Sequence, residues 1–92
     1  MITPAERKFL EFHHANPHVY NTFVRLARSA RRRGKNRLSI GMLFEVLRWE
    51  IALTTTDPDF KINNNYRPRY ARLLMKREPD LAGFFVLREM QP

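Results

Sequence analysis

Two stretches of the chain carry basic side chains and no acidic ones. The first, residues 25–37, contains Arg25, Arg28, Arg31, Arg32, Arg33, Lys35 and Arg37. The second, residues 60–77, contains Lys61, Arg67, Arg69, Arg72, Lys76 and Arg77. Cations concentrated on a few elements attract a polyanion and release its counterions, whereas dispersed cations mainly aid solubility. The pattern therefore favours contact with nucleic-acid phosphates.

Three asparagines, Asn63, Asn64 and Asn65, introduce the second stretch. Asn can bond adenine, and Arg can bond guanine, in a bidentate manner, so this composition suits direct contact with base edges. The candidate base-contacting residues are Asn64, Asn65, Arg67, Arg69 and Arg72, with Lys76 beside them. The alternative is that the asparagines form only a turn and a helix cap, and the arginines a solvated face.

The first stretch extends beyond the predicted end of a helix into Lys35, Asn36 and Arg37. Such a segment can follow a phosphate backbone or enter a minor groove, so we expect it to position nucleic acid rather than specify a sequence. Part of it has a structural explanation, because cations in the last turn of a helix complement the helix dipole. The predicted phosphate contacts are Arg25, Arg28, Arg31, Arg32, Arg33, Lys35 and Arg37.

Helix signals place these residues on a series of short helices. Thr3 and Glu6 form a capping box around Pro4, which predicts a helix from Pro4 to about Ala15. Asn16 and Pro17 repeat the start signal, and Gly34 is placed to end a second helix from Pro17 to about Arg33. On that helix the arginines lie opposite the apolar residues.

Ser39 is expected to cap a third helix, from Ile40 to about Leu53, that is apolar around most of its circumference. One face is Ile40, Leu43, Phe44, Leu47 and Ile51, and a neighbouring face is Met42, Val46, Trp49 and Leu53. A helix of this kind belongs at the hydrophobic centre of a small domain. Glu50 falls between the faces, so we expect it to pair with an arginine if it is buried.

A fourth helix is predicted to begin near Tyr66 or Arg67, with Asn65 as its cap, and to end before Pro79. The segment from Asp80 to Glu89 is expected to form a short closing helix. A buried helix, a connector of about ten residues and a basic helix follow the order of a helix-turn-helix, although the usual connector is three or four residues. The predicted fold is all-α: one small domain over residues 1–92, helix-turn-helix-like, with four to five helices and a minimal β wing as a variant.

The composition of the chain excludes several classes of function. The chain has 92 residues, a net charge of +8 and no cysteine, which excludes disulfides, thiolate zinc sites and cysteine nucleophiles. Its longest apolar run, residues 82–87, is far shorter than a membrane span, and Glu6 and Glu11 stand where a signal peptide would be basic and then apolar. We therefore expect a cytoplasmic, nucleoid-associated protein without a membrane partner.

Enzymatic and metal chemistry find little support in the sequence. His14 and His18 have a spacing that can chelate zinc within one helix, but Asn16-Pro17 interrupts that helix. His13 is instead expected at the edge of an apolar stripe, His14 in solvent and His18 in a first helical turn. There is no Gly-rich phosphate loop and no nucleophile elbow. We expect no catalytic residue, no metal and no cofactor.

The second half of the chain resembles small proteins encoded in phage and prophage genomes. The similarity rests on the segment Phe60 to Tyr66, on Tyr70-Ala71-Arg72, and on Pro79, Phe84, Phe85 and Arg88. Such proteins look like helix-turn-helix or winged-helix DNA binders, so the resemblance implies a phage or bacterial origin. A winged-helix version would require residues 60–65 to pair as a hairpin.

The predicted function is double-stranded DNA binding, as a phage or bacterial transcriptional regulator. The alternative is a phage-encoded module that binds and modulates a host protein, for which the sequence offers many aromatic side chains: Tyr20, Trp49, Tyr66, Phe84 and Phe85. Solvent exposure of Trp49 in the free protein that is lost when a partner is added would favour that alternative. The sequence leaves open whether RNA replaces DNA and whether the protein dimerises.

Overall fold

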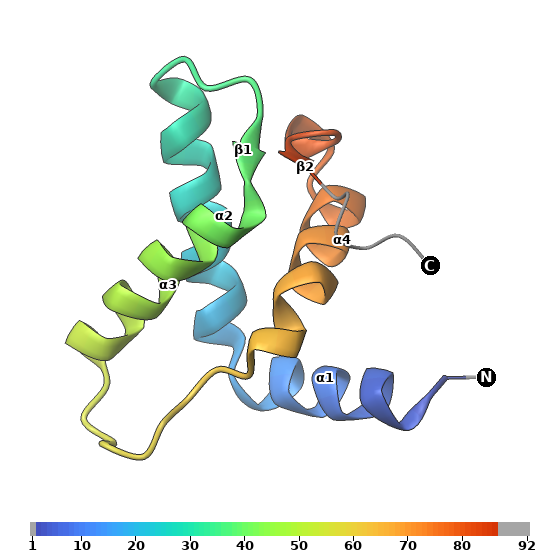
Figure 1. Cartoon of the computed structure of the whole chain (residues 1–92), viewed down its shortest axis with the longest axis vertical. Helices are drawn as coiled ribbons and strands as arrows, with labels where there is room; N and C mark the ends of the chain where they lie inside the picture. Colours follow the sequence, from blue (N-terminus) through green and yellow to red (C-terminus); the bar gives the residue numbers. More distant parts are fainter. Residues whose placement is uncertain (1, 87–92) are drawn as a thin grey trace.

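The computed structural model describes residues 2–86, with only the backbone of Val86. Four α-helices in this part of the chain pack around one core (Figure 1), which confirms the all-α prediction. They are α1 (Pro4–Ala15), α2 (Pro17–Arg32), α3 (Ile40–Thr54) and α4 (Arg67–Arg77). The 3-10 turns are η1 (Asn64–Tyr66) and η2 (Pro79–Leu81), and the strands are β1 (Leu38–Ser39) and β2 (Phe85–Val86). Across the described range, no helix has both the length and the hydropathy needed to cross a membrane.

The predicted caps set the helix bounds. The Thr3 hydroxyl accepts a hydrogen bond from the Glu6 amide at 3.1 Å, and the Ser39 hydroxyl accepts one from the Met42 amide at 3.4 Å. Gly34 follows α2 with a φ of 94°, a left-handed conformation that other residues rarely adopt. The predicted bounds of the first three helices are therefore confirmed to within one residue.

Aromatic side chains join the elements in the core. Phe23 of α2 is fully buried and contacts Phe44 of α3, Tyr70 of α4 and Phe85 of β2, with ring centroids 5.8–6.3 Å apart. His13 of α1 is also buried, and burial lowers its pKa, so its ring stays neutral near pH 7. The short strands run parallel, with Leu38 opposite Phe85. This pairing ties the chain after α4 to the chain between α2 and α3.

The structure corrects the prediction that α3 is buried on most sides. The face formed by Ile40, Leu43, Phe44, Leu47 and Ile51 is buried as predicted. The neighbouring face, Met42, Val46, Trp49 and Leu53, is exposed to solvent. The physical reason is size, because α2, α4 and β1 pack on one side of α3 and no further element in residues 2–86 covers the other.

The chain after α4 also differs from the prediction. The predicted helix over residues 80–89 is wrong where the structure describes it: η2 ends at Leu81, Gly83 has a φ of 74°, and residues 85–86 form β2. A left-handed glycine breaks a helix, and β1 offers backbone partners for a strand instead. The rest of that predicted helix, residues 87–89, lies outside the described residues.

The connector before α4 contains no β wing. Residues 60–62 pair with no strand, and η1 follows them, so the hairpin over residues 60–65 that a winged-helix version would require is not formed. Asn65 is not a helix cap either. Asn63 instead caps η1, the turn before α4, because its side-chain oxygen accepts a hydrogen bond from the Asn65 amide at 2.9 Å.

Candidate nucleic-acid interface

Three cations repeat on one side of α4. Arg69, Arg72 and Lys76 follow at intervals of three and four residues, and such intervals share one side of a helix. The buried residues Tyr70 and Leu74 anchor α4 to the core. Arg72 and Lys76 are exposed, and Arg69 is half-buried. We call Arg69, Arg72 and Lys76 the α4 basic stripe.

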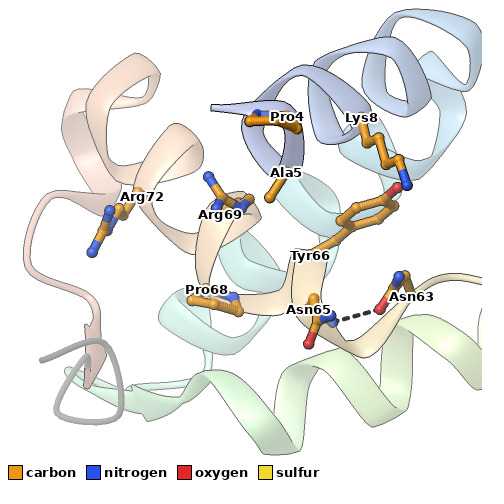
Figure 2. Close-up of a pocket in the computed structure, with 9 residues that line it drawn as sticks. All are labelled: Pro4, Ala5, Lys8, Asn63, Asn65, Tyr66, Pro68, Arg69 and Arg72. Atoms are coloured by element: carbon orange, nitrogen blue, oxygen red, sulfur yellow. Dashed lines mark hydrogen bonds between the residues drawn. The ribbon is translucent and has the colours of Figure 1, made fainter. Parts of the chain in front are cut away.

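A groove of about 590 Å³ lies beside the amino-terminal end of this stripe, between α1 and α4. Its polar and aromatic lining consists of Lys8, Asn63, Asn65, Tyr66, Arg69 and Arg72 (Figure 2). In this view Arg69 lies next to Pro4 and Ala5 of α1, whereas Arg72 points away from α1. Cationic and amide side chains around one groove can bind phosphates and donate hydrogen bonds to base edges.

Lys8 is a contributor to this groove that the sequence analysis missed. Nothing local marks it, because α1 also carries Glu6, Arg7 and Glu11 and has no basic run. The Glu6 carboxylate lies 3.9 Å from the Arg69 guanidinium, and both groups are partly exposed. An exposed ion pair at this distance is weak, so Arg69 can exchange Glu6 for an anion.

Two of the predicted base-contacting residues lie elsewhere. Arg67 is half-buried beside the first turn of α3, where its Nη1 is 3.6 Å from the position that a Cβ on Gly41 would occupy. Asn64 is exposed and lines a different hollow, together with Arg48 and Lys61. The structure thus brings Asn65 together with the α4 basic stripe and separates Asn64 and Arg67 from it.

A second group of cations occupies the end of α2 and the loop to β1. It consists of Arg31, Arg32, Arg33, Lys35 and Arg37, and we call it the α2–β1 basic segment. All five are exposed, and none forms an ion pair with another described residue. Their guanidinium and ammonium groups are therefore available to a polyanion.

Arg25 and Arg28, also predicted as phosphate contacts, already have acidic partners. Arg25 donates to Glu50 at 2.8 Å, so Glu50 pairs with an arginine although it is only half-buried. Arg28 donates to Glu78 at 2.7 Å and to Asp80 at 3.0 Å. These pairs join α2 to α3 and to η2, so we assign both arginines to the fold rather than to a ligand.

Arg28 should be a stabilising residue whose effect depends on pH. Its hydrogen bonds hold the pKa of the Asp80 carboxyl below its usual value. The pair therefore stabilises the fold above the unfolded-state pKa of about 3.9, and this contribution is lost as the pH falls through the lower, folded-state pKa. We expect Arg28→Ala to lower the urea midpoint at neutral pH and to differ less from the wild type in strong acid.

Arg32→Ala is the matched control, because Arg32 lies one turn further along α2 and has no acidic partner among residues 2–86. Its urea midpoint should stay close to that of the wild type at every pH. If Arg28→Ala unfolds at the same urea concentration as Arg32→Ala at neutral pH, the structural role of Arg28 is refuted.

The histidines lie where the sequence predicted. His13 contacts the apolar side of α1 and has Arg77 at 3.3 Å, whereas His14 and His18 are exposed. Among the described residues, no three histidine, aspartate or glutamate side chains come close enough together to hold a metal ion.

No family model, curated protein or solved structure matches the chain. The resemblance to phage proteins therefore stays a prediction, and Arg88, one of the residues that carry it, lies outside the described range. The geometry of the two basic clusters is the basis for a functional proposal.

Proposed function

We propose that the protein binds double-stranded DNA. The α4 basic stripe and Asn65 would contact base edges, and the α2–β1 basic segment would contact phosphates. The observation that carries the proposal is the distribution of acidic partners. Glutamates and aspartates neutralise Arg25, Arg28 and Arg48 at 3.3 Å or less, whereas the α2–β1 basic segment, Arg72 and Lys76 have no such partner in the described structure.

The dimensions of the molecule suit a duplex. The amino-terminal end of α4 and the carboxyl-terminal end of α2 lie far apart along the long axis (Figure 1), and the molecule extends 35 Å in that direction. One turn of B-DNA is about 34–36 Å long, so one copy of the protein is about as long as one turn of the duplex. The major groove of DNA admits a helix, whereas that of A-form RNA is too narrow, which favours DNA.

Transcriptional regulation in a phage or bacterium is the role we propose for this binding. The support for this role is the order of elements, because α3 is followed by a connector and then by the basic helix α4, which packs against α3. Helix-turn-helix proteins have the same order. The connector of residues 55–66 is longer than in those proteins, so the support is architectural rather than a motif.

Binding of the purified protein to a random duplex across a salt series tests the proposal. About six phosphate contacts predict that log affinity falls against log salt with a slope of roughly −5. Single-stranded DNA and duplex RNA of the same length are the controls. Equal affinity for RNA would transfer the function to RNA, and weak binding to all three at low salt would refute the proposal.

One observation favours a second candidate, a module that binds a host protein. Trp49 is 67% exposed on the outer face of α3, and exposed tryptophans are common at the centres of protein interfaces. Apolar contact depends little on salt, so capture of a host protein that resists high salt, without DNA binding, would favour this candidate over the first.

A further inference from the structure

The outer face of α3 carries a continuous apolar surface. Met42, Val46, Trp49 and Leu53 are 61%, 42%, 67% and 67% exposed, and we call them the α3 apolar stripe. At 3.6 residues per turn the four positions share about 60° of the helix circumference, roughly opposite the buried face. Single exposed apolar residues are ordinary, but four on one side of a helix over about three turns indicate a contact surface.

The charges beside the stripe balance one another. On one side Glu45 pairs with Arg48 at 3.3 Å, and on the other Glu50 pairs with Arg25 at 2.8 Å. The chain as a whole has a net charge of +8, so two copies repel each other over most approaches. The α3 face is a region where two copies can meet without local repulsion, whereas an acidic partner would be drawn to the basic clusters instead.

The spacing of the stripe residues allows two copies of α3 to pair with each other. Intervals of four, three and four residues are those of the seam between two paired helices. If two copies of α3 pair antiparallel about a two-fold axis between Leu47 and Arg48, Met42 lies opposite Leu53 of the other copy. Val46 then lies opposite Trp49, so the smallest side chain of the stripe faces the largest. A two-fold interface requires this kind of self-match.

We propose that the α3 apolar stripe is the interface of a homodimer. The occupant is a second copy of this chain, paired antiparallel through α3. The stripe spans only about three turns of one helix, which places the contact at the small end of specific interfaces, so the dimer should dissociate at concentrations on the order of 10 μM.

Sedimentation equilibrium of the full chain, over protein concentrations spanning three orders of magnitude, tests this proposal. The wild type should change from monomer to dimer, and Trp49→Glu should stay monomeric throughout. Ile2→Glu is the matched control, because Ile2 is an exposed apolar residue before α1 and receives the same charge. Both substitutions are at exposed positions, and circular dichroism should show unchanged helix content in each.

The emission of Trp49 gives an independent readout, because it is the only tryptophan in the chain. Emission should shift to the blue over the concentration range in which the mass doubles, since the indole leaves water. A wild type that stays monomeric, or a Trp49→Glu variant that still dimerises, overturns the proposal. If the wild type stays monomeric, the α3 apolar stripe becomes a candidate surface for binding a host protein instead.

The dimer has a consequence for DNA that rests on the proposed function. Each α4 lies on the core side of its α3, so the two-fold axis relates two α4 basic stripes, and a selected DNA site should be an inverted repeat. The dimer proposal and the DNA-binding proposal can be refuted independently of each other. A Trp49→Glu monomer should keep its affinity for random duplex and lose cooperative binding to the repeat, whereas absence of DNA binding leaves the sedimentation result unchanged.

Discussion

Replacing all five residues of the α2–β1 basic segment with alanine should weaken binding to selected and random duplex by the same factor. At physiological salt that factor should be roughly 10³ to 10⁴, because each of the five phosphate contacts contributes about 0.9 to the slope of log affinity against log salt. With five contacts removed, the slope itself should become shallower by about 4.5. Equal losses are expected because phosphates are the same in every sequence. Fluorescence anisotropy with two labelled duplexes across a salt series measures both quantities.

Two double variants that remove the same charge from different places provide the control. Arg32→Ala with Arg33→Ala should lower the slope by about two, whereas Arg7→Ala with Lys61→Ala removes the same charge from exposed positions outside both clusters. If the two double variants lose affinity equally, binding follows net charge alone, and the segment has no special place in the interface. All four positions are exposed, so the fold should tolerate each change.

Much of the helical framework could be predicted from local signals. Thr3, Ser39 and Gly34 act within one helical turn, through a side-chain hydrogen bond or a left-handed backbone, so their effect is visible in a few adjacent letters. The segment after Pro79 carries no local signal that decides between a helix and a strand. A short apolar run fits a helix or a strand equally well, and its partner strand, β1, lies more than forty residues earlier in the chain.

The candidate site was harder to predict, because it depends on which charges meet in space. Arg28 resembles its neighbours on α2 in sequence, and its acidic partners lie 50 and 52 residues further along. Lys8 joins the groove only because η1 and α4 pack against α1. The exposure of Trp49 has the same origin, since hydropathy shows that a face is apolar but not whether another element covers it.

Sequence preference should depend on Arg69 and Arg72. Replacing both with alanine should reduce the ratio of selected to random affinity by roughly 10²-fold, because a bidentate contact between arginine and a base contributes about 1–3 kcal/mol of discrimination. Arg72→Lys is the informative companion, since lysine keeps the charge but lacks the planar fork that bonds guanine. It should preserve random binding and still lose preference. Competition between a selected and a random duplex measures the ratio.

Arg67→Ala separates this role from simple loss of charge on the same helix. Arg67 lies against the first turn of α3 and away from the α4 basic stripe, so its removal should leave the affinity ratio unchanged. If Arg67→Ala lowers the ratio as much as Arg72→Ala does, α4 does not present the stripe to bases. If Arg69→Ala with Arg72→Ala weakens selected and random duplexes equally, these arginines contact phosphates. In that case, base recognition lies in Asn65 or in the shape of the DNA.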